Sequence, residues 1–134
     1  MRIALVFLAS VSFASAYCFE SAGRYYGVSP RLLWAIAKVE SGHRWNALNK
    51  NKNGTYDIGL MQINSRWLPV LKRYGLYDER WIWDPCYNTF VGAWVLRQCI
   101  NRYGYNWKAV DCYNKGSKAK ETSQYVWKVY RSLR

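Results

Sequence analysis

Apolar side chains recur at helical spacing in the stretch that follows Ser29-Pro30. Serine is a favoured N-cap and proline a favoured first residue of a helix, so this pair marks a helix start. Gly42 is typical of the residue just after a helix ends. The apolar positions between these signals are Leu32, Leu33, Ile36, Ala37 and Val39. They predict an amphipathic helix that begins at Pro30 and ends just before Gly42.

Four more helices are predicted, over residues 65–74, 87–103, 106–113 and 121–132. Ser65 is the expected cap of the first, although Pro69 is unfavourable inside it. Residues 46–57 are instead rich in Asn, Lys and Gly, and Asn53-Gly54 is a signal for a two-residue hairpin turn. Residues 58–64 would continue this hairpin. The pattern predicts an α+β fold that is mostly helical, with a small β-hairpin.

Residues 1–16 have the pattern of a cleaved signal peptide. Met1-Arg2 gives a positive start, residues 3–9 are apolar, and Ala14-Ser15-Ala16 is a small-x-small cleavage site. The apolar run is shorter than the roughly 20 residues that span a bilayer. We therefore expect export with cleavage after Ala16, no stable membrane anchor, and one domain over residues 17–134.

All four cysteines lie in the exported part of the chain, where an oxidising compartment would pair them. Cys86 and Cys99 lie near opposite ends of one predicted helix, about 20 Å apart, which is too far for a disulfide. A turn near Gly104 would instead bring Cys99 close to Cys112. The expected disulfides are therefore Cys99–Cys112 and Cys18–Cys86.

The exported chain is strongly basic. Without Arg2 it has 19 basic and 8 acidic residues, a net charge of +11. Such a charge suits an anionic polymer or surface. Export and the lack of a nucleic-acid-binding motif argue against nucleic acid. Cysteines without CxxC spacing and a single histidine, His43, argue against zinc. We expect no metal and no cofactor.

Glu40 is the strongest candidate for chemistry. It follows Leu33 by seven residues and Ile36 by four, so its carboxyl group shares the apolar face of the predicted helix. It also lies in the last turn, where the helix dipole disfavours a negative charge. Both effects raise the pKa of a carboxyl group. A carboxylic acid that is neutral near pH 7 in a cleft can protonate a glycosidic oxygen. The alternative is a glutamate that points to solvent at the helix end.

Four short motifs occur in order along the chain: Glu40-Ser41, Gly59-Leu60-Met61-Gln62-Ile63-Asn64, Tyr113-Asn114-x-Gly116 and Tyr125. This set resembles the catalytic domain of soluble lytic transglycosylases. More narrowly, it is similar to the small periplasmic members that accompany type III and type IV secretion systems and conjugative pili. The resemblance covers nearly all of residues 17–134. It implies a lysozyme-like domain with two lobes around a cleft and a periplasmic location; we expect a monomer.

The resemblance also implies a reaction and its partners. The family cleaves the MurNAc–GlcNAc β-1,4 bond of peptidoglycan glycan strands without water, leaving a 1,6-anhydro end. Glu40 would be the single catalytic acid and base. The cleavage would open the wall locally for components of a secretion or pilus apparatus.

The same resemblance implies a set of residues that bind the glycan. Met61 and Gln62 would touch the sugar, and Tyr113 would hydrogen-bond near Glu40. The expected substrate-binding residues are Ser41, Gly59, Leu60, Met61, Gln62, Asn64, Tyr113, Asn114 and Tyr125.

Asp57 leaves other interpretations open. It lies 17 residues after Glu40, in a segment that also resembles animal-type lysozyme, where an aspartate acts as nucleophile or electrostatic partner. A carboxyl group about 5 Å from the acid would support retaining hydrolysis. Alternatively, Asp57 braces the hairpin, since Asp favours turns. The competing hypotheses are a transglycosylase, a lysozyme-type hydrolase that uses both carboxyl groups, and a non-catalytic cationic cell-wall-binding protein.

Overall fold

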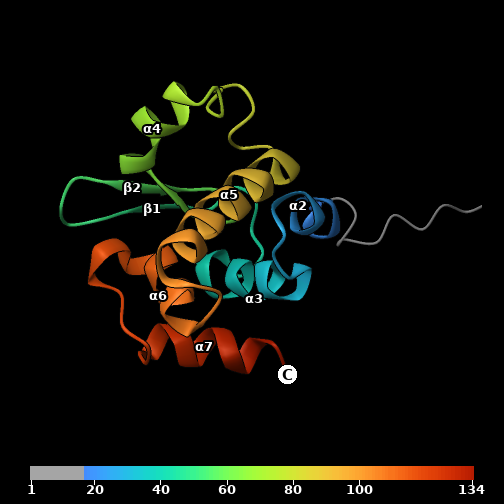
Figure 1. Ribbon diagram of the computed structural model, residues 1–134. Coiled ribbons are helices and arrows are strands. Elements are labelled where there is room, and N and C mark those ends of the chain that lie inside the picture. The colour runs from blue at the N-terminus through green and yellow to red at the C-terminus, as the bar shows by residue number, and fades with distance from the viewer. Residues whose placement is uncertain (1–16) are drawn as a thin grey trace, which may run out of the picture.

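Helix α5 (Pro85–Tyr103) runs through the middle of the molecule, with the sheet and α4 (Leu68–Arg73) on one side and α6 (Trp107–Lys115) and α7 (Gln124–Ser132) on the other (Figure 1). The computed structural model describes residues 17–134, so the predicted signal peptide, residues 1–16, lies outside the described residues. The predicted mostly helical α+β fold is confirmed, with a small antiparallel sheet.

Two further helices lie beside α5, namely α2 (Phe19–Tyr26) and α3 (Pro30–Ser41). Helix α3 has the bounds that its capping residues predict, because the Ser29 side chain accepts a hydrogen bond from the backbone N–H of Leu32 and Gly42 adopts a left-handed conformation. The sequence did not reveal α2. It spans only two turns, and its buried residues, Phe19, Ala22 and Gly23, make too short a pattern for helical periodicity to stand out.

The β structure differs in detail from the predicted hairpin. It has three strands, β1 (Leu48–Lys50), β2 (Tyr56–Ile58) and β3 (Ile63–Asn64), in the order β1-β2-β3. Residues 51–55 form a five-residue loop in place of a two-residue turn. Within this loop Asn53 accepts a hydrogen bond from the backbone N–H of Thr55. Residues 59–62 do not continue a strand but form a turn between β2 and β3.

The predicted helix over residues 65–74 is two short pieces, a 3-10 helix η1 (Ser65–Trp67) followed by α4. Asn64, rather than Ser65, caps it by accepting from the backbone N–H of Arg66. Pro69 fits because it lies in the first turn of α4, where a helix does not need that N–H. The other three helices begin one to three residues from the predicted positions, directly after their true caps Asp84, Asn106 and Ser123.

The core lies where α5 packs against α2, α3, α6 and β3. Its largest fully buried apolar side chains are Leu33, Ile36, Leu60, Met61, Ile63, Leu71, Ile82, Leu96 and Val129. Both predicted disulfides are present, Cys18–Cys86 and Cys99–Cys112. The first joins α5 to the residue before α2, and the second joins α5 to α6. Within residues 17–134, no helix combines the length and apolar character needed to cross a membrane.

Candidate active site

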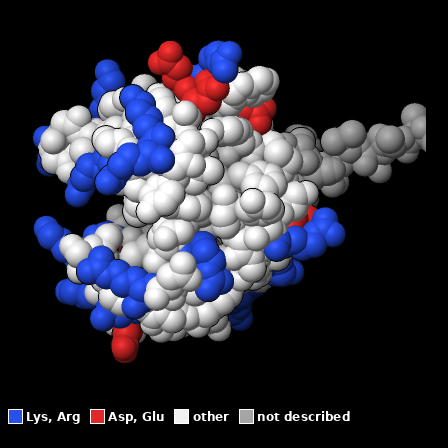
Figure 2. Space-filling model, turned by 45° about the horizontal axis from the view of Figure 1, so that its top comes forward, with Lys and Arg blue, Asp and Glu red and all other residues white. Residues whose placement is uncertain are grey.

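A cleft of about 780 Å³ lies between the sheet and the helices α6 and η2 (Gly116–Lys118). Figure 2 shows this hollow between two lobes, with Lys and Arg side chains on both rims. Two carboxyl groups line it, Glu40 and Asp57. They come from different walls, since Glu40 ends α3 and Asp57 lies in the middle of β2.

Glu40 is a partly buried acid held by one tyrosine. The hydroxyl group of Tyr125 on α7 donates to Oε2 of Glu40 at 2.9 Å. Burial raises the pKa of Glu40 from its ordinary 4.5 to about 7, and the negative charge of Asp57 acts in the same direction. Hydrogen bonds from Tyr125 and Asn114 and the positive charge of Lys115 oppose this shift without cancelling it. Glu40 therefore has the protonation behaviour of a general acid near neutral pH.

Tyr125 is itself kept protonated. Burial raises its pKa well above the ordinary 10, and the nearby Glu40 adds to the effect. The ammonium group of Lys115 lies 5.3 Å from the centre of the Tyr125 ring and 2.6 Å from Oδ1 of Asp111. Asp111 is fully buried and also accepts from the hydroxyl of Ser123 and the backbone N–H of Lys120. This network fixes the chain between α6 and α7, which forms one wall of the cleft.

Unlike Glu40, Asp57 is surrounded by the amide side chains of asparagines. Its oxygens accept hydrogen bonds from the side-chain amides of Asn64 at 2.9 Å and Asn51 at 3.1 Å. Asn49 and Asn64 are its direct neighbours on the two flanking strands. All these partners are neutral N–H donors at a partly exposed position. Such donors suit an acceptor-only carboxylate rather than a carboxylic acid.

The turn between β2 and β3 forms the floor beside Glu40, and three side chains fix its backbone. Ser41 donates to the carbonyl oxygen of Leu60 at 2.7 Å, Tyr113 donates to that of Met61 at 2.6 Å, and Asn88 donates to that of Ile58. Asn88 also accepts from the backbone N–H of Met61 at 2.7 Å. These bonds tie the floor to α3, α5 and α6 together.

Gly59 is needed at this turn for two reasons. Its φ angle is +75°, and a Cβ atom there would lie 2.6 Å from the amide nitrogen of Asn88. Gly92 on α5 has a similar role, because a Cβ there would meet Met61 at 2.8 Å. The main role of the segment Gly59 to Asn64 is thus to pack the floor of the cleft against α5.

The structure places several of the predicted substrate-binding residues in the floor beneath the cleft rather than in its lining. Leu60 and Met61 are completely buried in the core, so their side chains do not reach the cleft, and Ser41 is buried with its hydroxyl used by the floor. The hydroxyl of Tyr113 bonds the carbonyl of Met61, and it is Tyr125 that bonds Glu40. The predicted residues that do line the cleft are Gln62, Asn64, Tyr113 and Asn114.

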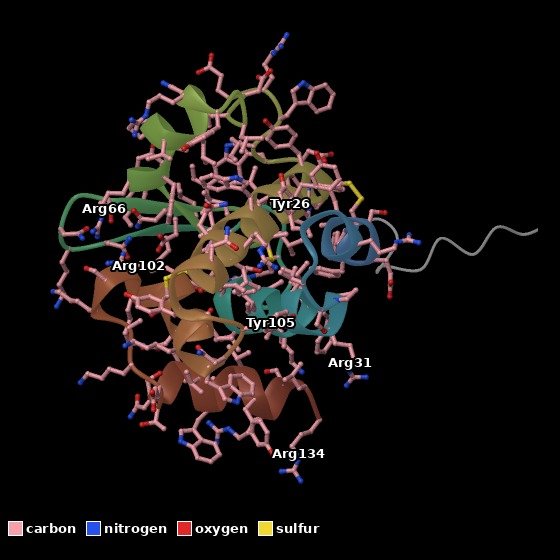
Figure 3. All side chains as sticks on the ribbon, viewed as in Figure 1. Tyr26, Arg31, Arg66, Arg102, Tyr105 and Arg134 are labelled. Carbon is pink, nitrogen blue, oxygen red and sulfur yellow. A yellow bond between two sulfur atoms is a disulfide. The ribbon has the colours of Figure 1, made fainter. Side chains whose placement is uncertain are left out.

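Sequence reasoning missed two kinds of residue. Asn88 was hidden within a long apolar helix, although an uncharged polar side chain on a buried face signals a required hydrogen-bond partner. The cations that line the cleft are Lys52, Arg66, Lys115 and Lys118. They come from three separate segments, since Lys115 and Lys118 lie together at the junction of α6 and η2, and only folding brings these segments together; Figure 3 labels Arg66 on the sheet side. Across residues 17–134, no group of three or more His, Cys, Asp or Glu side chains could hold a metal ion.

The sequence of the chain matches a known protein family. The family model described as "Transglycosylase SLT domain" matches residues 17–128. The chain belongs to the transglycosylase SLT domain family. By family it is a lytic transglycosylase, the class of enzyme that cleaves peptidoglycan.

The similar proteins include several from enteric bacteria. Invasion protein IagB of Salmonella typhimurium (strain SL1344) is 36% identical over 138 residues, covering 98% of this chain and 86% of that protein. The "X polypeptide" of Escherichia coli (strain K12) is 38% identical, covering 98% and 80%. Protein IpgF of Shigella flexneri is 38% identical, covering 87% and 78%.

A solved structure shares this fold. It is lytic transglycosylase Slt from Pseudomonas aeruginosa, crystallised as an inactive variant in which one glutamate is replaced by glutamine. The match has a TM-score of 0.69 at 19% identity and covers 86% of this chain. The chain spans only 22% of that longer protein. The lysozyme-like two-lobed fold expected from the sequence is confirmed.

Proposed function

We propose that this chain cleaves the MurNAc–GlcNAc β-1,4 bond of peptidoglycan by lytic transglycosylation, with Glu40 as the only group that gives and takes the proton. The observation that carries the proposal is the partly buried Glu40 carboxyl, which receives the Tyr125 hydroxyl at 2.9 Å and has a pKa of about 7. At neutral pH a large share of this group is protonated and ready to act as an acid.

The proposed reaction needs no water and returns Glu40 to its starting state. Glu40 donates its proton to the glycosidic oxygen as the bond from that oxygen to the anomeric carbon breaks. The N-acetyl group of the substrate stabilises the anomeric centre. The Glu40 carboxylate then takes the proton of the 6-hydroxyl group, and the 6-oxygen bonds to the anomeric carbon. The product is a 1,6-anhydro ring, and no net proton is consumed.

Asp57 supports a second candidate, hydrolysis of the lysozyme type. It lines the same cleft and lies near enough to raise the pKa of Glu40. Its amide donors Asn51 and Asn64 hold a carboxylate facing the cleft. In the transglycosylase this carboxylate stabilises positive charge at the anomeric carbon; in a hydrolase it would act as nucleophile or electrostatic partner.

For biological context, we propose that the enzyme acts in the periplasm after removal of residues 1–16 and opens the wall locally for a secretion or pilus apparatus. The support is the similarity to a protein named as an invasion protein and the presence of two disulfides, which form in oxidising compartments.

Mass spectrometry of the released muropeptides tests the reaction. Purified peptidoglycan is digested with this protein and, in parallel, with a hydrolytic lysozyme. We expect anhydro ends, lighter by one water than the reducing ends that the lysozyme leaves. Reducing ends from this protein would favour the hydrolase. Binding without any cleavage would favour a wall-binding protein.

A further inference from the structure

Helix α7 has an exposed face that the glycan cleft does not use. Tyr125, Val126 and Val129 are buried against the domain, whereas Trp127, Tyr130 and Arg131 are exposed. Helical geometry of 100° per residue places 127, 130 and 131 on the same outward side. One side of α7 therefore packs on the domain, and the opposite side presents large aromatic rings to solvent.

These rings form a continuous cluster with Trp107 at the start of α6. Tyr130 lies 5.9 Å from Trp107 and 5.8 Å from Trp127, measured between ring centres. The exposed fractions are 57% for Trp127, 43% for Tyr130 and 37% for Trp107. Single exposed rings are common, but three in contact on the surface indicate a site for a partner.

Several cations lie on the same helices as these rings. Lys108, Lys128, Arg131 and Arg134 belong to α6, α7 and the residues just after it, and α7 contains no acidic residue. Arg31 donates to the carbonyl oxygen of Leu133, which places another cation at the end of α7. Figure 3 shows Arg31 and Arg134 at this same end of the molecule.

We propose that the face formed by Trp107, Trp127, Tyr130, Arg131 and Arg134, here called the α7 surface, binds the headgroup region of an anionic lipid bilayer. Tryptophan and tyrosine rings favour the boundary between headgroups and acyl chains, because they combine an apolar body with a polar tip. Each nearby Lys or Arg adds attraction to anionic headgroups. Aromatic rings flanked by cations on one side of a helix are the pattern of a helix that lies on a membrane surface.

The geometry favours a lipid surface over a glycan at this position. A sugar stacks on the open flat side of a ring, usually within a groove. Here the rings pack edge to face, at 80° for Trp107 with Tyr130 and 88° for Trp127 with Tyr130. None of these rings lines the cleft or the two smaller hollows of the surface.

The chain provides a matched control in a second exposed tryptophan. Trp81 is 54% exposed, similar to Trp127, but it lies in the segment of Asp78, Glu79 and Asp84. Within four residues of Trp81 there are three acidic residues and one cation, Arg80, whereas within four residues of Trp127 there are two cations and no acidic residue. If the α7 surface binds anionic lipid, the two tryptophans must behave differently.

Co-sedimentation with vesicles tests the proposal. One set contains equal parts of phosphatidylethanolamine and phosphatidylglycerol, and the reference set replaces phosphatidylglycerol with phosphatidylcholine. We expect the wild type to bind the anionic vesicles and not the reference vesicles. Arg131→Glu with Arg134→Glu is expected to weaken binding at least about 25-fold, since each lost cation costs about fivefold. Trp127→Ala is expected to weaken it about tenfold.

Two controls separate this site from the general positive charge of the protein. Arg24→Glu with Arg73→Glu changes the net charge equally at exposed positions outside the α7 surface, and Trp81→Ala removes the matched ring. Both are expected to retain most of the vesicle binding, and thermal melting checks that every variant is folded. Equal losses in the two charge-reversed pairs, or no binding by the wild type, would overturn the proposal. The proposal would also be overturned if Arg131→Glu with Arg134→Glu lost binding to purified glycan strands but kept its binding to vesicles.

Discussion

The two carboxyl groups of the cleft, Glu40 and Asp57, lie close enough to interact but have very different surroundings. Glu40 ends a helix whose inner face is core, and its bonded neighbour is a tyrosine with a raised pKa. Asp57 lies in a small strand among asparagines. The first setting favours the neutral acid by desolvation, and the second provides donors for a negative charge. The same functional group can thus serve as proton donor or as charge stabiliser, depending on the wall that presents it.

The largest expected effect is the loss of the proton donor. Glu40→Gln keeps the shape of the side chain and an oxygen that can accept from Tyr125, but it has no proton of suitable acidity. We expect the rate of muropeptide release to fall at least about 1000-fold, within the range of general acid–base catalysis. Pull-down with insoluble peptidoglycan is expected to show unchanged binding. Lysis at the wild-type rate would remove Glu40 from the mechanism.

A smaller loss is expected on the opposite wall. Asp57→Asn preserves size and removes the negative charge, so the anomeric centre loses electrostatic stabilisation; we expect turnover to fall about 100-fold, with the remaining product still anhydro. The pKa of Glu40 should also decrease, because Asp57 raises it. The acidic shift would appear in the pH dependence of the residual rate. A rate within a factor of two of wild type would show that Asp57 only braces the hairpin.

The raised pKa of Glu40 also predicts that ionisation of this group lowers the stability of the folded protein. Between pH 4.5 and about 7 the folded protein keeps a proton that the unfolded chain has lost, so the free energy of unfolding falls as the pH rises. Glu40→Gln removes this dependence. At pH 8 the variant is expected to be more stable than wild type by up to about 3 kcal/mol. At pH 4 the gain should vanish, and urea unfolding at the two pH values measures it; an equal gain at both would point to packing instead.

The sequence predicted those features that local chemistry determines. Ser29-Pro30 and Gly42 predicted the two ends of α3. The predicted helices on either side of Gly104 were enough to pair Cys99 with Cys112. The spacing of apolar residues placed Glu40 on an inward face of its helix. Each of these inferences needs only neighbours along one helix, or two helices joined by one turn.

Apart from the Cys18–Cys86 disulfide, the sequence did not predict the contacts between distant segments that build the site. Met61 was expected at the sugar, but it fills the space that Gly92 leaves on α5, 31 residues further along the chain. Tyr125 reaches Glu40 across 85 residues, and Asn88 reaches Met61 across 27. A motif shows that residues act together; only the fold distinguishes those that face the cleft from those that support it.

The titration of Glu40 itself tests the central claim most directly. With ¹³C-labelled glutamate side chains, NMR follows each of the carboxyl groups of Glu20, Glu40, Glu79 and Glu121 as the pH is changed. The signal that disappears in Glu40→Gln identifies the catalytic candidate. We predict a midpoint of about 7 for this signal. A midpoint near the ordinary 4.5 would mean that Glu40 is a carboxylate at neutral pH, and it would contradict its role as the proton donor.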